Sequence, residues 1–148
     1  HGSRASYRNL LTRDALEGEK VSRFMTTEPV TVPASISVQT LIEDYVYKHH
    51  FKMFPVMDGE KLIGCITVSD IKEIPVEQRN KTSVVEAAQG CRKEQNTVST
   101  DTDAMQALSL MHRSANSRLM VVDGEKLVGI IALKDLLHFL SLKMDLEQ

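Results

Sequence analysis

The stretch Pro55-Val-Met-Asp-Gly-Glu-Lys-Leu-Ile-Gly-Cys-Ile-Thr-Val-Ser-Asp-Ile71 recurs 65 positions later as Met120-Val-Val-Asp-Gly-Glu-Lys-Leu-Val-Gly-Ile-Ile-Ala-Leu-Lys-Asp-Leu136. Nine of the seventeen aligned pairs are identical, and both copies share the run Asp-Gly-Glu-Lys-Leu. Agreement at this density does not arise by chance, so the chain contains an internal duplication. Self-similarity at a fixed spacing is the signature of repeated structural units, and it constrains the fold more than any single element does.

Each copy predicts a β-hairpin followed by a helix. Short, continuous apolar runs are typical of strands buried on both faces, and an Asp-Gly pair between two such runs marks a tight turn. Pro75 should end the helix of the first copy early. The expected strands are Phe54–Met57, Leu62–Val68, Leu119–Val122 and Leu127–Leu133, and the expected helices are Asp70–Ile74 and Asp135–Met144.

Upstream of each hairpin the sequence predicts a short strand and then an amphipathic helix. Ser35 or Ser37 should start the first of these helices, and Thr102 or Asp103 should cap the second. The unit is therefore β-α-β-β-α, present twice, which predicts an α/β (α+β) fold of two repeats packed with pseudo-twofold symmetry. The expected short strands are Val30–Val32 and Thr97–Val98.

The duplication also divides the chain. We expect a first repeat over residues 21–75, a connection over 76–83, a second repeat over 84–144 and a tail over 145–148. Residues 1–20 belong to neither repeat, and Ser6–Glu17 predicts a leader helix that Gly18 ends. His1-Gly2-Ser3 is typical of the remnant of a cleaved tag, so we expect the chain to be part of a longer protein.

Composition and charge exclude several classes of protein. With 18 basic and 20 acidic residues the formal charge is −2, which argues against a nucleic-acid partner. No apolar run approaches the roughly 20 residues that span a bilayer, so we expect no direct membrane insertion. Two cysteines are too few for a disulfide framework and fit a reducing, cytoplasmic compartment, with Cys65 in the core and Cys91 exposed. The 3 Tyr, 4 Phe and absent Trp predict an aliphatic core.

The duplicated unit resembles a tandem CBS-domain pair, also called a Bateman module. The residues that carry the resemblance are Arg23-Phe24-Met25-Thr26 ahead of Pro29–Pro33, then Phe54-Pro55-Val56, then Gly64–Asp70, and it extends over about Val21–Met144. The resemblance implies a non-catalytic regulatory module with no obligatory cofactor. Its ligand would be adenosine-containing (AMP, ADP, ATP or S-adenosylmethionine) and would bind in the cleft between the repeats.

A narrower resemblance concerns the attached protein. Tyr7–Met25 and Asp44–Val56 are similar to the CBS region appended to site-2-type intramembrane zinc metalloproteases. This implies an upstream membrane-embedded protease domain, with the CBS pair on the cytosolic face. The chain itself has no His-Glu-x-x-His motif, nucleophile elbow or Walker loop, so we expect no catalytic residue and no metal site in it.

Thr67-x-x-Asp70 is the sharpest candidate binding site. It stands where a strand ends and a helix begins, so free backbone N–H groups and the helix dipole favour an anion there. Thr67 would donate to a phosphate, Asp70 would accept from the ribose hydroxyls, and an apolar slot around Val30 and Thr31 would contact the base. The same Thr and Asp would also form a capping box without any ligand.

The second copy departs from this pattern because Ala132 replaces the threonine, while Asp135 persists beside Lys134. Losing one hydroxyl–phosphate bond should weaken binding by about 1–2 kcal/mol. Lys134 would compensate as a point charge or simply be solvated, and Asp135 would bind ribose or cap the last helix. Arg118 lies where CBS proteins often supply a basic residue to the shared cleft, or it is an exposed residue flanking a strand; its counterpart is Met53.

Two functions remain open at this stage. The first is a nucleotide sensor that controls the attached domain. The second is a ligand-free interaction scaffold in which the helices of residues 36–47 and 135–144 pair two chains into a homodimer.

Overall fold

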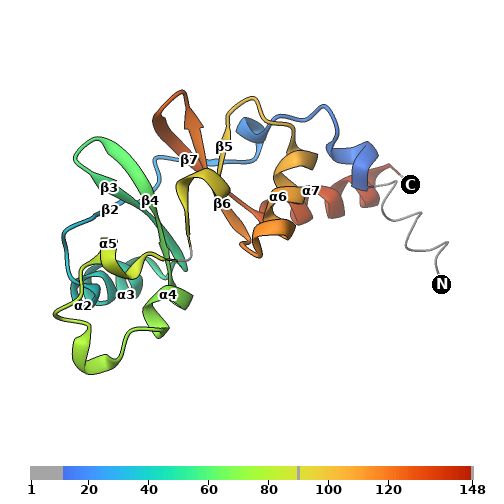
Figure 1. The fold of residues 1–148 in the computed structure, drawn as a ribbon. Helices are drawn as coiled ribbons and strands as arrows, with labels where there is room; N and C mark the ends of the chain where they lie inside the picture. The colour runs from blue at the N-terminus through green and yellow to red at the C-terminus, as the bar shows by residue number, and fades with distance from the viewer. Residues whose placement is uncertain (1–11, 90, 148) are drawn as a thin grey trace.

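Two small β-sheets, one for each repeat, organise the residues that the structure describes, which are 12–89 and 91–147. In the computed structural model the two hairpins point the same way, and the helices of the two repeats lie on opposite sides of the pair of sheets (Figure 1). The first sheet has the order β2-β3-β4 and the second the order β1-β7-β6-β5. The strands are β1 (Thr26–Thr27), β2 (Val32–Pro33), β3 (Met53–Asp58), β4 (Lys61–Thr67), β5 (Thr97–Ser99), β6 (Arg118–Asp123) and β7 (Lys126–Ala132).

Both predicted hairpins form. β3 pairs antiparallel with β4, and β6 pairs antiparallel with β7. Gly59 and Gly124 make the turns with φ of +62° and +64°, a conformation that a residue with a Cβ adopts only under strain. The register slips once in each hairpin, after Val56 and after Val121, so the duplication extends to the irregularities of the ladders. β2 and β5 run parallel to β3 and β6, as a connection through a helix requires.

The helices begin at residues that the sequence predicts as caps. Ser37 Oγ accepts from the backbone N of Thr40 at 3.1 Å. Asp103 Oδ1 accepts from the backbone N of Met105 at 2.8 Å. Ser37 and Asp103, rather than Ser35 and Thr102, are therefore the caps. The helices are α2 (Val38–Leu41), η2 (Ile42–Val46, a π-helical turn), α3 (Tyr47–His49), α4 (Val68–Lys72), α5 (Val84–Ala87), α6 (Ala104–Ser114) and α7 (Leu133–Leu146), with short 3₁₀ turns η1 (Val21–Arg23), η3 (Val76–Gln78) and η4 (Lys93–Gln95).

Three groups of buried side chains hold the modules together. One lies within each module between its sheet and its helices, and the third lies between the two sheets. Phe54 is 1% exposed and is the largest fully buried side chain of the described residues, so the expectation of a purely aliphatic core is wrong at this position. The inter-sheet group contains Met53, Leu62, Cys65, Cys91 and Met120.

The helix α5, which follows the connection over residues 76–83, packs on the first module. Ser83 and Glu86 form a capping box at the start of α5, and the side-chain hydrogen bond from Ser83 lowers the pKa of the Glu86 carboxyl below its ordinary value. Val84 and Ala87 of α5 are buried in the core of the first module. The start of the expected second repeat therefore packs on the first module, just as Val21 of η1, at the start of the first repeat, is buried in the core of the second module.

The leader packs on the second module. Residues 12–16 are helical and Gly18 ends the helix with φ of +85°, whereas Ser6–Leu11 of the predicted leader helix lie outside the described residues. Leu16 is fully buried in the second core. The backbone N of Ala104 donates to Glu19 O at 2.7 Å, so backbone hydrogen bonds join the leader to the start of α6.

The segment that enters each repeat crosses to the sheet of the other repeat. β1 precedes the first module but pairs with β7, through Thr26↔Ile130 and Thr27↔Gly129. Positions 91 and 92, which are 65 residues after β1, lie along β4 of the first sheet, where Arg92 forms a bridge with Gly64. The two modules are therefore tied together by a reciprocal exchange of short extended segments.

The cysteines meet at one of these crossings. Cys65 on β4 and Cys91 form a disulfide, with a Cα–Cα distance of 5.2 Å, inside the range that disulfides require. Cys91 belongs to residues 91–96, which lead into β5 and are called the entry segment of the second repeat. The two residues are 0% and 3% exposed, so the prediction of an exposed Cys91 is wrong. Within the described residues, no helix is both long enough and apolar enough to cross a bilayer.

Candidate functional site

Thr67 and Asp70, the leading candidate binding residues, lie where β4 ends and α4 begins. The backbone N of Asp70 donates to Thr67 Oγ1 at 3.2 Å, and the backbone N of Thr67 donates to Asp70 Oδ2 at 2.9 Å. The capping box expected as the alternative is therefore present at the start of α4. A hydroxyl that accepts this bond keeps its own proton for a phosphate oxygen, so cap and ligand contact are compatible. Because α4 has only five residues, recognition would depend on side chains more than on a helix dipole.

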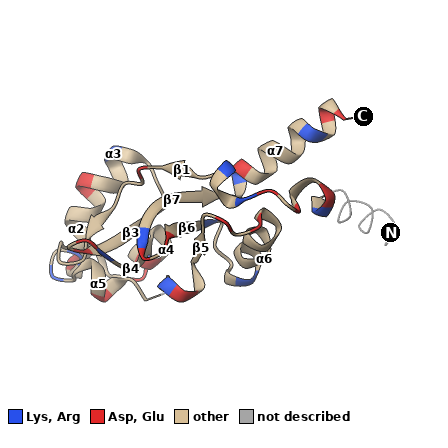
Figure 2. Ribbon diagram, turned by 90° about the horizontal axis from the view of Figure 1, so that it is seen from above, with Lys and Arg blue, Asp and Glu red and all other residues tan. Residues whose placement is uncertain are grey.

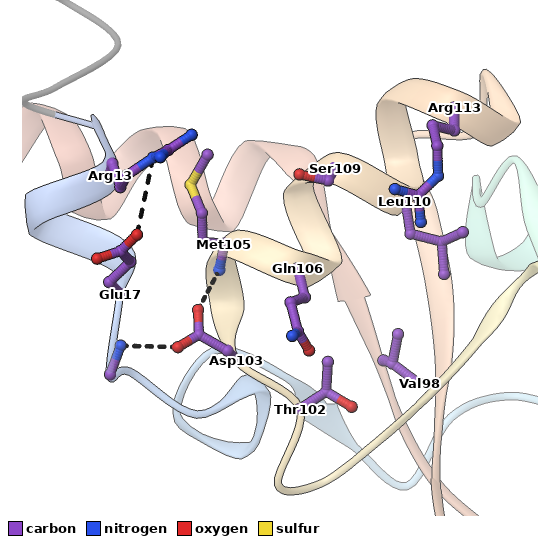
Figure 3. A pocket seen from close by; sticks show the side chains of 11 residues that line it. Arg13, Glu17, Val98, Thr102, Asp103, Met105, Gln106, Ser109, Leu110 and Arg113 are labelled. Carbon is purple, nitrogen blue, oxygen red and sulfur yellow. Dashed lines mark hydrogen bonds and ion pairs between the residues drawn. The ribbon is translucent and has the colours of Figure 1, made fainter.

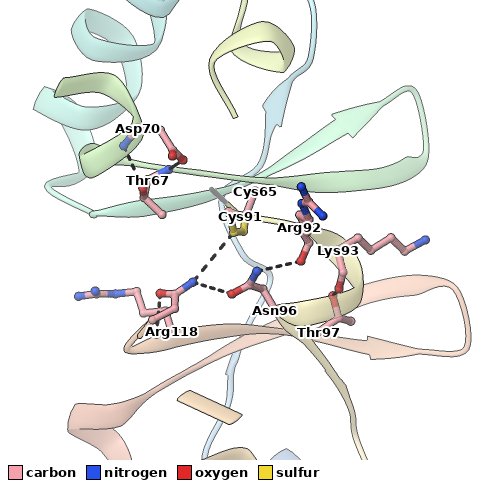
Figure 4. The surroundings of a disulfide bond; sticks show 10 residues. Cys65, Thr67, Asp70, Cys91, Arg92, Lys93, Asn96, Thr97 and Arg118 are labelled. Atoms are coloured by element: carbon pink, nitrogen blue, oxygen red, sulfur yellow. Dashed lines mark hydrogen bonds between the residues drawn. A yellow bond between two sulfur atoms is a disulfide. The ribbon is translucent and has the colours of Figure 1, made fainter. Parts of the chain in front are cut away.

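Arg118 begins β6 at the matching position of the second hairpin. It faces Ala132 across the ladder, as Met53 faces Thr67 in the first. Figure 4 shows Arg118 on the same side of the disulfide as Thr67 and Asp70. Its Nη1 donates to Ser117 Oγ at 3.3 Å, and among residues 12–89 and 91–147 its guanidinium takes part in no ion pair. The structure thus brings a cation toward the end of the sheets that carries the first predicted pair.

The second copy keeps the geometry and lacks the hydroxyl. Ala132 occupies the N-cap position of α7 with no side-chain hydrogen bond. The backbone N of Leu133 donates to Ser117 O at 2.7 Å, which fixes the start of α7 beside Arg118. Asp135 is half-buried in the first turn of α7 and Lys134 is exposed. Arg118, Lys134 and Asp135 therefore lie at one end of the second module.

The structure separates the two residues predicted to contact a base. β2 runs parallel to β3 with Val32 beside Val56, and Val30, just before β2, packs against the first core. Thr31 instead lines a cavity of about 1040 Å³ between the two hairpin tips, together with Tyr45, Glu60, Lys126 and other residues. The tips are at the opposite end of the strands from Thr67, so this cavity is a different place from the predicted cleft.

A second cavity, of about 830 Å³, lies between the leader and α6 (Figure 3). The Asp103 carboxylate joins the two sides of this cavity. One of its oxygens accepts from Met105 N of α6 and the other from Gly18 N of the leader, both at 2.8 Å. Neither cavity includes Thr67, Asp70, Arg118, Lys134 or Asp135. Sequence reasoning identified Asp103 as a possible cap but not its bond to Gly18, which joins residues 85 positions apart.

Replacing Asp103 with alanine should lower the free energy of unfolding by about 1–2 kcal/mol, because both the cap of α6 and the bond to Gly18 are lost. Urea unfolding measures the effect. Asp101→Ala is the matched control, because Asp101 makes only an exposed ion pair with Lys20 at 3.3 Å and should cost less than about 1 kcal/mol. Equal losses in the two variants would contradict the role assigned to Asp103.

Charge and metal-ligand chemistry are dispersed over the structure. Acidic and basic residues are scattered over both modules (Figure 2). In the part of the chain that the structure describes, no three His, Cys, Asp or Glu side chains converge in a way that could hold a metal ion. One end of the two sheets does gather polar groups. They are the hydroxyl of Thr67, the carboxylates of Asp70 and Asp135, and the cations of Arg118 and Lys134.

The comparison with protein families assigns the duplication. The CBS-domain model matches residues 21–77 and again 91–142. The chain belongs to the CBS-domain family. The two matches cover the two modules, so the predicted CBS pair is confirmed.

Relatives and solved structures extend this assignment. The zinc metalloprotease MJ0392 of Methanocaldococcus jannaschii is 34% identical over 125 residues, which are 83% of this chain and 32% of that protein. Inosine-5'-monophosphate dehydrogenase of Haemophilus influenzae is 32% identical over 130 residues, 84% of this chain and 26% of that enzyme. The CBS pair thus spans about a third or less of these relatives. The CBS domain of a bacterial CNNM/CorC-family Mg²⁺ transporter, solved in complex with ATP, has the same fold, with a TM-score of 0.76 and 19% identity over 89% of this chain and 94% of that one.

Proposed function

We propose that this CBS pair is a non-catalytic regulatory module that binds an adenosine nucleotide at the Thr67 end of the paired sheets and controls an attached domain. The observation that carries the proposal is the presence of Arg118, free of ion pairs within the described residues, at the end of the second hairpin that matches the Thr67–Asp70 end of the first. ATP in the CNNM/CorC relative supports this ligand class.

Each of these groups suits one part of a nucleotide. The Arg118 guanidinium can bind phosphate oxygens in a bidentate manner, and the Thr67 hydroxyl can add a further donor. The Asp70 carboxylate accepts from the ribose hydroxyls, and Val30 offers apolar surface to the base. In the second copy Lys134 and Asp135 provide a weaker site, because Ala132 has no hydroxyl to donate.

The nucleotide would act by favouring one arrangement of the two modules. It can shift the attached domain only by the difference between its affinities for the two arrangements, typically about 1–3 kcal/mol. We propose a site-2-type zinc metalloprotease as that domain, with this module at the cytosolic face, on the basis of the MJ0392 relative. The reading frame of the full protein tests this: an upstream apolar segment with His-Glu-x-x-His supports it, and a dehydrogenase domain contradicts it.

Titration calorimetry with AMP and ATP tests nucleotide binding. Asp70→Asn should raise the dissociation constant about tenfold or more, because the carboxylate is lost while the amide oxygen can still accept from Thr67 N and preserve the cap. Asp135→Asn is the matched control in the other repeat and should change the constant less. The proposed site would be contradicted if neither nucleotide produced binding heat with the unmodified protein. Equal effects of the two variants on the dissociation constant would also contradict it.

A ligand-free scaffold is the second candidate, and the surface of α7 favours it. The exposed apolar side chains of this helix are Leu137, Leu142, Met144 and Leu146. A homodimer would cover such a face through the helices. Mass measurement in solution with and without AMP separates the two candidates, because a constitutive dimer that binds no nucleotide supports the scaffold alone.

A further inference from the structure

The Cys65–Cys91 disulfide occupies the point where the entry segment of the second repeat crosses the first sheet. Cys65 N donates to Cys91 O at 3.4 Å, and Gly64 is bridged to Arg92. The pseudo-symmetric crossing joins Thr26 to Ile130, with no cysteine in either position. One of the two crossings is therefore covalent, and the other is held by backbone hydrogen bonds and by the packing of residues such as Met25 against the second core.

The disulfide is connected to both halves of the proposed nucleotide site. On one side, Cys65 lies two residues before Thr67 on β4. On the other, Asn116 Nδ2 lies 4.0 Å from Cys91 Sγ and donates to Asn96 Oδ1 at 3.1 Å. Asn116 Oδ1 in turn accepts from the backbone N of Arg118 at 3.2 Å.

The amide network around Cys91 is itself buried. Asn96 is 3% exposed, its Nδ2 donates to Arg92 O at 2.8 Å, and its backbone O accepts from Met120 N at 2.8 Å. The buried Asn96 side chain and backbone oxygen therefore all have hydrogen-bond partners. Cys91 is thus linked through the Asn116 side chain to the backbone of Arg118, at the start of β6.

We propose that Cys65–Cys91 is a redox-controlled clamp between the two modules that sets the nucleotide affinity of the site at Thr67 and Arg118; the affinity part rests on the proposed function. In the oxidised form the clamp holds β4 and the entry segment in one arrangement, so the binding groups are preorganised. In the reduced form only hydrogen bonds and the apolar packing between the sheets hold the crossing, and the two modules are freer to move relative to each other. A disulfide in a reducing compartment is usually a transient, sensing bond, which fits this role.

The chemistry is a two-electron thiol–disulfide exchange. A thiolate of a dithiol reductant attacks one sulfur of the clamp, the S–S bond breaks, and a mixed disulfide forms. The second thiol of the reductant then displaces the remaining protein sulfur. Cys65 and Cys91 each end with one proton, and the dithiol is oxidised to a disulfide. Because both cysteines are buried, attack requires local opening of the short entry segment, which is held to β4 by few backbone bonds.

The state of the cysteines is measured first, on the whole chain. After incubation with oxidised glutathione, alkylation in denaturant and mass spectrometry should find no alkylated cysteine, whereas after dithiothreitol treatment in the same denaturant they should find two. The melting temperature of the oxidised protein should exceed that of the reduced protein by about 10 °C, as expected for a cross-link that closes a loop of this length. Hydrogen exchange should become faster over residues 91–98 on reduction. Two alkylated cysteines in the glutathione-treated protein, or identical melting and exchange, would overturn the clamp.

Nucleotide affinity is measured second. Reduction should raise the dissociation constant for AMP by about fivefold or more, within the usual range of coupling between sites. The double variant Cys65→Ala, Cys91→Ala is the matched control and should not respond to dithiothreitol. If no form binds AMP, the proposed function fails while the melting and exchange data still decide the clamp. Equal AMP affinity in verified oxidised and reduced protein would overturn the coupling.

Discussion

Replacing Gly129 with alanine should lower the free energy of unfolding by about 3 kcal/mol, because the new methyl group has no space. A Cβ at this position would lie 2.7 Å from Thr26 O and 2.9 Å from Met25 Sδ. The Met25 side chain can rotate away, but Thr26 O is backbone and belongs to β1. The substitution therefore forces β1 off the edge of the second sheet, where Thr27 faces Gly129.

The internal duplication supplies the matched control. Gly64 is the equivalent glycine of the first repeat, and a Cβ there would lie 3.3 Å from Cys91 O, a contact that a shift of a few tenths of an ångström relieves. Gly64→Ala should cost less than about 1 kcal/mol, since the loss of unfolded-chain entropy partly offsets the contact. Urea unfolding measures the stability of both variants. The slope of the transition should stay unchanged, which would show that only the stability differs. Equal midpoints for the two would contradict the close approach of β1 to Gly129.

These two glycines show what a repeat can and cannot reveal. The sequence predicted both hairpins, their Asp-Gly turns and the helices that follow, because each depends on residues close together in the chain. It aligned Gly64 with Gly129, yet it gave no sign that a segment of the other repeat crosses each of them. β1 has two residues, too few for a periodic pattern, and its partner lies about a hundred positions away.

The same limit applies to the cysteines and to the candidate site. Cys65 and Cys91 are 26 positions apart in different repeats, and only the crossing brings them together. The Thr67–Asp70 capping box was expected because it is local. The packing of Val30 on the core and the exposure of Thr31 to the cavity were not, because they depend on how β2 lies against its neighbours. In general, the local part of the site followed from the sequence, and the part shared between repeats did not.

Replacing Phe54 with alanine should have the largest effect of any single substitution considered, a loss of about 3–5 kcal/mol. Phe54 is 1% exposed in the first core, and its ring meets Tyr45 edge-on at 6.1 Å between centroids. Removing the ring opens a cavity within the first core, where Phe54 faces Ile66 across the ladder. Thermal and urea unfolding measure the loss, and Phe54→Leu should recover more than half of it.

Phe51 separates the effect of burial from the effect of losing an aromatic ring. It lies three residues earlier, stacks on His49 at 5.6 Å and also approaches Phe54 at 6.0 Å, yet it is 46% exposed. Phe51→Ala removes the same atoms but leaves no cavity, so it should cost about 1 kcal/mol or less. If Phe51→Ala were as destabilising as Phe54→Ala, the ring contacts rather than the packed core would hold the first module together. The burial of Phe54 in the first core, on the strand that pairs with β4, argues that the packed core holds this module together.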